Sequence, residues 1–165
     1  MNPGLLDTNN RCERRIDWVK VLQERARYSD VLNADELATE LNVAPGSLRK
    51  ALGRQRKRGL VERVTHKIYI NRLASDHTPY DLVNVLRPNS YVSLESALRF
   101  WGVSTQIPAA VTCVTTGKPR EYGSHSFRIV YRSISEKLFW GFTEQRTRYS
   151  RYRIAEPEKA LLDWT

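Results

Sequence analysis

The sequence of 165 residues predicts an α+β fold. Its first half holds three stretches with apolar residues at helical spacing, followed by two short β-rich runs. Its second half mixes short helical stretches with several runs rich in β-branched and aromatic residues. Hydrophobic residues make up 41% of the chain, which is enough for a packed core. We therefore expect two small domains, residues 1–74 and 75–165.

Two amphipathic helices are predicted first. Residues 10–28 carry apolar side chains at helical spacing. Asn33, with Glu36 three residues later, has the pattern of a capping box, which satisfies backbone N–H groups at the start of a helix. The apolar stripe that follows predicts a second, short helix that runs to about Leu41.

A third helix and a hairpin complete the first domain. Pro45 suits the first helical position, where its missing N–H costs nothing, and Gly59 suits the end of the helix. The β-rich runs 60–64 and 67–70 are separated by two residues and predict a small hairpin. Helix, short helix, tight turn, helix and hairpin is the order of a winged helix-turn-helix, so we expect that fold here.

After a linker at residues 71–78, the second domain is predicted to be a small mixed α/β unit. Thr78 is expected to cap a short helix that begins at Pro79, and another helix follows Ser93. Four strands and a last helix are expected later, at residues 111–116, 127–133, 138–142, 152–155 and from Pro157. Because the chain stops one residue after Trp164, we expect this domain to be C-terminally shortened.

The chain is strongly basic, and the excess of positive charge gathers in the third helix. The net charge is +9, and residues 47–59 hold six basic residues and no acidic one. Excess Lys and Arg raise affinity for polyanions by releasing condensed counterions. A solvated helix face is the alternative interpretation, but the place of this helix in the predicted fold favours nucleic acid.

The third helix has a core side and a cationic side. At about 100° per residue, Leu48 and Gln55 fall on the core side, and Gly53 falls on the opposite side, where we hypothesise that it allows close approach to DNA. Such a helix fits the major groove, with Lys50 and Arg49 as the expected base-reading residues. The expected DNA-binding residues are Ser47, Arg49, Lys50, Arg54, Arg56, Lys57 and Arg58 in the helix, and His66 and Lys67 at the hairpin tip.

The sequence lacks convincing motifs for catalysis. Residues 116–118 resemble the end of a phosphate-binding loop but lack its earlier glycine. Glu158 and Lys159 hint at a metal-dependent nuclease, yet that chemistry needs an acid two residues before the lysine, where Pro157 stands. We expect no enzyme activity, no cofactor and no metal. A metal-dependent DNA nuclease and an RNA- or small-ligand-binding winged-helix module remain the alternatives.

The two cysteines and the hydropathy of the chain indicate the cellular compartment in which the protein works. Cys12 and Cys113 lie far apart and outside any zinc-binding pattern, which favours two free thiols over a disulfide. No apolar run approaches the roughly 20 residues that span a bilayer. The first ten residues lack the basic-then-apolar order of a signal peptide. We therefore expect a cytoplasmic protein with no membrane partner.

Two sequence blocks in the second domain resemble a known family. The first is YVSLESAL at residues 91–98, with WGV and QIP shortly after it, and the second is IAEPEKALLD at residues 154–163. In this order behind a winged helix, they resemble the AbiEi antitoxins of type IV, abortive-infection toxin-antitoxin systems, over essentially the whole chain. The resemblance implies a transcriptional repressor that binds inverted repeats in its own promoter through residues 47–58 and the wing. It also implies pairing with a nucleotidyltransferase-like toxin that the C-terminal domain neutralises, with direct contact left open.

Overall fold

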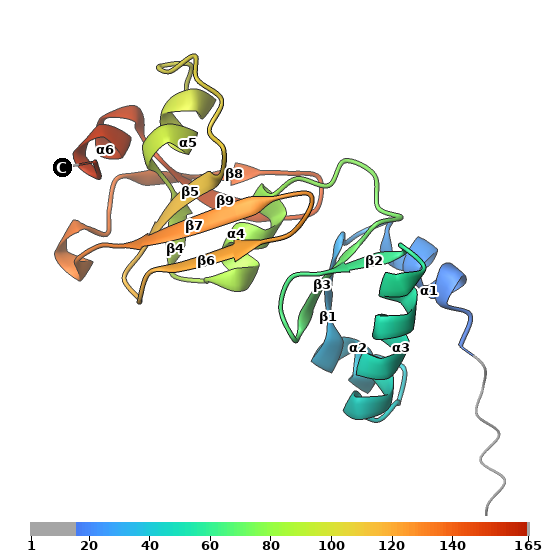
Figure 1. The fold of residues 1–165 in the computed structure, drawn as a ribbon. Coiled ribbons are helices and arrows are strands. Elements are labelled where there is room, and N and C mark those ends of the chain that lie inside the picture. The colour runs from blue at the N-terminus through green and yellow to red at the C-terminus, as the bar shows by residue number, and fades with distance from the viewer. Residues whose placement is uncertain (1–15, 165) are drawn as a thin grey trace, which may run out of the picture.

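The computed structural model describes residues 16–164 and shows a mixed α+β protein (Figure 1). We call residues 16–74 the N-terminal half and residues 75–164 the C-terminal half. Each half has its own β-sheet, and buried hydrophobic side chains form one cluster centred in each half. Within the described residues, no helix has the length and apolar character that a membrane span requires.

Three helices and a three-stranded antiparallel sheet make up the N-terminal half. The elements in chain order are α1 (Trp18–Arg25), β1 (Val31–Asn33), α2 (Ala34–Glu40), α3 (Pro45–Lys57), β2 (Val61–Arg63) and β3 (Ile68–Asn71). The predicted hairpin is present as β2 and β3, and β1 pairs with the other edge of β3. The helices cover one face of this sheet, where Leu22, Leu48 and Leu52 are fully buried.

The first helix is shorter than predicted. Asp17 caps α1 by accepting a hydrogen bond from the backbone N–H of Lys20 at 3.2 Å, so the helix starts after this residue. The prediction of a helix over residues 10–28 was therefore wrong at residues 16 and 17, and its last part, 26–28, is a turn. Residues 10–15 of that prediction lie outside the described residues.

Helices α2 and α3 begin where the sequence predicts. Asn33 Oδ1 accepts a hydrogen bond from the backbone N–H of Asp35 at 3.0 Å, and the Asn33 amide donates to Glu36 Oε1 at 3.0 Å. The predicted capping pair thus forms, although Glu36 binds the cap side chain instead of its backbone. Pro45 opens α3, and Gly59 follows its end with a φ of +74°, a conformation that favours glycine.

A six-stranded mixed sheet forms the centre of the C-terminal half. The elements are α4 (Tyr80–Leu86), β4 (Ser90–Val92), α5 (Leu94–Phe100), β5 (Val111–Thr115), β6 (Arg120–Gly123), β7 (Arg128–Ser133), the 3-10 turn η1 (Glu136–Leu138), β8 (Phe142–Arg146), β9 (Arg151–Ala155) and α6 (Pro157–Leu162). The strand order is β6-β7-β5-β4-β9-β8, with β4–β9 and β5–β7 parallel. Tyr152 of β9 stacks on α4, while Tyr91 of β4 reaches α6, so helices cover both faces of the sheet.

Several predictions in this half were wrong. The strand predicted at residues 138–142 is absent over residues 138–141, because Gly141 adopts a φ of +72° beside the Lys159 side chain, and β8 begins only at Phe142. Strands β4 and β6 were missed, since each is only three or four residues long. The predicted linker begins too early: Asn71 is the buried end of β3, and its amide donates to Leu22 O at 2.7 Å.

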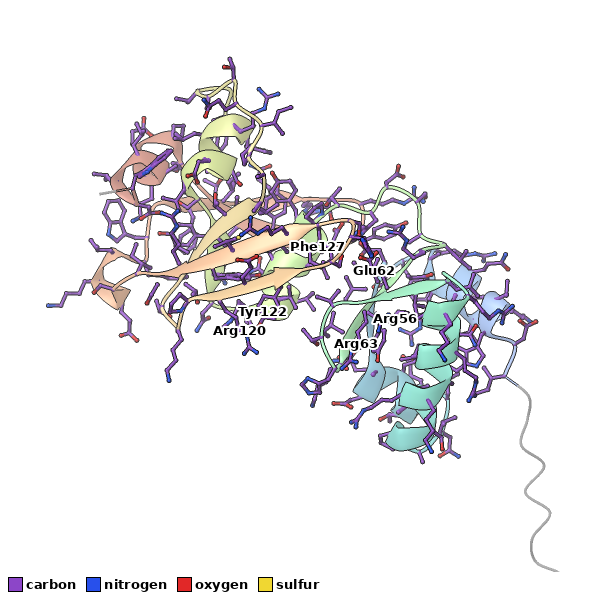
Figure 2. The ribbon with its side chains drawn as sticks, viewed as in Figure 1. Arg56, Glu62, Arg63, Arg120, Tyr122 and Phe127 are labelled. Atoms are coloured by element: carbon purple, nitrogen blue, oxygen red, sulfur yellow. The ribbon has the colours of Figure 1, made fainter. Side chains whose placement is uncertain are left out.

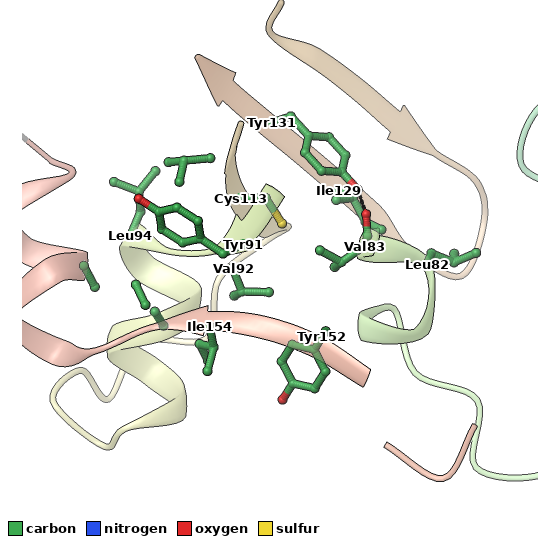
Figure 3. Close-up of a cluster of buried hydrophobic side chains, with 14 of the residues drawn as sticks. Leu82, Val83, Tyr91, Val92, Leu94, Cys113, Ile129, Tyr131, Tyr152 and Ile154 are labelled. Carbon is green, nitrogen blue, oxygen red and sulfur yellow. Dashed lines mark hydrogen bonds between the residues drawn. The ribbon is translucent and has the colours of Figure 1, made fainter. Parts of the chain in front are cut away.

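The core of the C-terminal half includes alternate side chains of β7. Ile129 and Tyr131 are buried, and the Tyr131 hydroxyl donates to Val83 O at 2.8 Å (Figure 3). Cys113 is a free, buried thiol in the same cluster, and burial raises its pKa. Cys12, the other predicted free thiol, lies outside the described residues.

The two halves share a packed interface across the three-stranded sheet. Tyr69 of β3 is buried among the helices of the N-terminal half, whereas its neighbour Ile70 belongs to the cluster of the C-terminal half. This division follows from the alternation of side chains along a strand. On the same face as Ile70, Glu62 accepts a hydrogen bond from Ser126 Oγ at 2.9 Å. Both faces of the small sheet are therefore covered.

Candidate nucleic-acid interface

Helix α3 has the two sides that the sequence predicts. Leu48 and Leu52 are fully buried, and Gln55 is only 4% exposed. The buried Gln55 amide oxygen accepts a hydrogen bond from Arg58 Nη1 at 3.1 Å, which accounts for a polar residue on the core side. Gly53 lies on the outer side, where an added Cβ would meet no atom within 4 Å.

The outer side of α3 is a cationic surface. All the polar residues predicted there are exposed, namely Ser47, Arg49, Lys50, Arg54, Arg56, Lys57 and Arg58. Among the described residues, no acid lies within ion-pair distance of Lys50, Arg54, Arg56 or Lys57. Six cations over about 20 Å of helix therefore face solvent with no acidic residue among them.

The hairpin tip joins the start of this surface through one carboxylate. Lys67 Nζ lies 2.6 Å from Asp35 Oδ2, and Arg49 Nη2 lies 3.7 Å from Asp35 Oδ1. The backbone of the tip is also held, because Lys67 O accepts a hydrogen bond from the N–H of Ala34 at 2.7 Å. His66 is exposed beside Lys67. The structure thus brings Arg49 and Lys67 together, while the cations from Arg54 onward lie one or more turns away along α3.

Asp35 remains ionised at neutral pH. The hydrogen bond from Lys67 lowers the pKa of this carboxyl below its ordinary value, and the charges of Lys67 and Arg49 act in the same direction. Within residues 16–164, Asp35 is thus the one acid that forms ion pairs with two of the predicted DNA-binding residues, Arg49 and Lys67. Sequence analysis missed it, because an acid in the first turn of a helix is ordinary.

Arg63 is a second residue that the sequence did not single out. It lies at the end of β2, is exposed, and its Nε donates to Thr65 O at 3.1 Å, which orients its guanidinium along the hairpin. A lone arginine at the end of a short strand carries no distinguishing sequence signal.

One group of residues in the described part of the chain has the composition of a metal site. Asp30, His77 and Asp81 bring potential ligand atoms within 4.8 Å of one another. However, the two oxygens of Asp81 already accept hydrogen bonds from four donors, on Thr78, Thr147 and Ser150. Asp30 is bonded to His77 Nδ1 and is 1% exposed. These contacts describe a hydrogen-bonded junction between the halves.

The residues that hinted at a nuclease are arranged differently. Lys159 is 3% exposed and pairs with Asp163, whose other oxygen accepts hydrogen bonds from Ser93 Oγ at 2.6 Å and Tyr91 OH at 3.0 Å. Burial raises the pKa of Tyr91, with a further contribution from Asp163. The Lys159 ammonium also lies 5.0 Å from the ring of Trp140. The cluster is closed to a large substrate, and it ties α6 to β4.

That cluster also joins the two sequence blocks at residues 91–98 and 154–163. Besides the bonds to Asp163, Trp101 Nε1 donates to Ala155 O at 2.8 Å, so the segments are linked at both ends of α5. Their residue types are thus explained by packing within the C-terminal half. No protein-family model matches the chain, and no curated protein matches it either.

Proposed function

We propose that residues 18–71 act as a winged helix-turn-helix that binds duplex DNA, with α3 in the major groove and the β2–β3 hairpin as the wing. The observation that carries this proposal is the outer side of α3, where six exposed cations lie opposite a fully buried leucine side, and only Arg49 of the six contacts an acid among the described residues. A helix held by its apolar side can enter a groove about 12 Å wide. The net charge of +9 adds the long-range attraction that such proteins use.

We further propose that the protein is a transcriptional repressor of its own promoter and the antitoxin of a type IV toxin-antitoxin system. The resemblance of residues 91–98 and 154–163 to AbiEi antitoxins supports this role. A repressor of this kind works in the cytoplasm and performs no catalysis. Its functional partner is a nucleotidyltransferase-like toxin, and the C-terminal half carries the neutralising activity.

A titration of labelled promoter DNA tests the DNA-binding role. Arg54→Ala should weaken binding to every duplex, because Arg54 contacts phosphate, whereas Lys50→Ala should relax the preference for the promoter over random DNA. Lys137→Ala, which removes an exposed charge from η1, is the matched control and should change neither. Tighter binding to RNA than to duplex DNA, or equal effects of all three variants, would contradict the proposal.

Coexpression tests the antitoxin role separately. The chain should restore growth to cells that produce a nucleotidyltransferase-like toxin encoded in the neighbouring reading frame. The Arg54→Ala variant should restore growth equally well, since α3 serves DNA binding alone. Failure of both proteins to restore growth would remove the antitoxin role and leave DNA binding intact.

A further inference from the structure

The strand β6 carries an arginine that is free to bind a polyanion. Arg120 is exposed, and its guanidinium carbon lies 5.4 Å from the centre of the Tyr122 ring. Tyr122 in turn packs edge-on against Tyr131, with ring centres 5.9 Å apart, and Tyr131 is anchored by its bond to Val83 O. A chain of aromatic contacts therefore holds Arg120 in place from the core outward.

The two faces of the β6–β7 hairpin differ in charge. Arg128 binds Glu121 through two hydrogen bonds of 2.6 and 3.2 Å, so its charge is neutralised. Arg120 pairs in register with Tyr131 and projects from the opposite face, as the alternation of the strand requires. Among the described residues, no acid forms an ion pair with Arg120. The unpaired cation is on the face that carries Tyr122.

Arg120 borders the same space as the hairpin of the N-terminal half. Figure 2 labels Arg63 at the β2–β3 hairpin and Arg120 with Tyr122 on β6, the strand of the C-terminal half drawn nearest that hairpin in this view. Glu62 of β2, which precedes Arg63, is bound by Arg72 at 2.9 Å and by Ser126 Oγ at 2.9 Å. In the part of the chain that the structure describes, no acid forms an ion pair with Arg63 or with Arg120.

The packed interface between the halves fixes this arrangement. Ile70 is fully buried in the cluster of the C-terminal half, although it belongs to the sheet that supports the hairpin. The Tyr149 hydroxyl adds hydrogen bonds to Ala26 O at 3.1 Å and Ser75 O at 2.6 Å. Arg120 therefore keeps a constant position relative to α3 and the hairpin tip.

We propose that Arg120 contacts the DNA backbone beyond the wing, so that the C-terminal half lengthens the protein's footprint on the duplex. This inference rests on the proposed DNA binding by α3. A duplex that runs from α3 past the hairpin presents phosphates in a regular row, and a phosphate contact needs a positioned charge but no base sequence. Arg63 and Arg120 supply such charges on either side of the space between the halves.

Titrations with promoter duplexes of different length test this contact. Arg120→Ala should lower affinity for a long duplex on the order of fivefold and reduce the slope of log affinity against log salt by about 0.9, the value for one lost phosphate contact. Arg120→Lys should restore most of the slope, because charge matters more than shape. On a duplex trimmed at the wing side, wild type and Arg120→Ala should bind equally.

Lys137→Ala is the matched control, since it removes one exposed charge of the C-terminal half that lies outside the β6–β7 hairpin. Equal effects of Arg120→Ala and Lys137→Ala, or an effect of Arg120→Ala that survives trimming, would overturn the inference while wild-type binding still stands. If wild-type protein binds none of the duplexes, the proposed function itself is wrong.

Discussion

Asp35 lowers the positive charge at the end of α3 that lies beside the hairpin tip. It contacts a cation from α3 and a cation from the hairpin tip, and it holds both near the start of α2. A carboxylate at this point repels phosphate while it orients Arg49 and Lys67. We interpret it as a residue that limits binding to random DNA, where electrostatic attraction dominates.

Replacing Asp35 should therefore increase unspecific binding. Asp35→Asn should raise affinity for a random-sequence duplex several-fold and steepen the salt dependence by about one unit, because Lys67 becomes free for phosphate. Fluorescence anisotropy at several salt concentrations measures both quantities. Asp76→Asn is the control: it releases Arg148, its partner at 2.7 Å, away from α3. Equal changes in both variants would show that total charge alone matters.

The candidate surface was predictable from sequence where it depends on one helix. A run of six cations and an apolar stripe with helical spacing define α3, and the structure confirms which side is buried. Asp35 and Arg63 were not predictable, because their significance comes from neighbours that are distant in sequence. The same limit applies to Arg120, whose relation to the hairpin depends on the packing of two halves.

At the scale of elements, α3 combines the proposed DNA-binding surface with a residue that lowers its helix stability. Gly53 lies in the helix interior, where glycine costs about 1 kcal/mol relative to alanine. No atom lies within 4 Å of an added Cβ at this position. The structure therefore offers no packing reason for a glycine here, and two hypotheses stay open: close approach to DNA, or a tolerated surface glycine.

Two substitutions of Gly53 separate stability from binding. Gly53→Ala should raise the free energy of unfolding by roughly 0.5–1 kcal/mol, measured by urea denaturation. Gly59→Ala should lower it instead, since Gly59 has a φ of +74°. Gly53→Leu should weaken DNA binding without loss of stability. Unchanged affinity in Gly53→Leu would reject the close-approach hypothesis.

Element types were predicted best where caps and periodicity agree. Pro45 and Gly59 frame α3, and Ser93 and Gly102 frame α5, as expected. Strands β4 and β6 gave no usable pattern, because strands of three or four residues are defined by the partner they pair with. The aromatic run before Phe142 resembled a strand but packs as a turn.

The molecule as a whole depends on tyrosines buried as neutral phenols. Burial raises the pKa of Tyr152 to about 12, with smaller contributions from Tyr80 and Asp81. Burial also raises the pKa values of Tyr80, Tyr91 and Tyr131. In the unfolded chain these phenols ionise near pH 10. The contribution of these tyrosines to the free energy of unfolding is therefore complete below pH 10 and is lost as the pH rises toward 12.

Thermal unfolding at increasing pH measures this loss. Tyr152→Phe should flatten the fall of the melting temperature above pH 10, because one group that binds its proton more tightly in the folded state is removed. Tyr28→Phe removes a hydroxyl from an exposed tyrosine and is the matched control. If the melting temperatures of wild type and Tyr152→Phe fall equally above pH 10, Tyr152 does not contribute to this loss of stability.

The parallel pairing of β4 with β9 affects how the protein folds during translation. On the ribosome, α1 through β3 can assemble from neighbouring segments, whereas β4 emerges long before β9. Likewise, Tyr91 and Ser93 can donate their hydrogen bonds to Asp163 only after Asp163 has been synthesised. A nascent chain therefore exposes an unpaired strand edge late in translation, and the C-terminal half should be the part most in need of a chaperone.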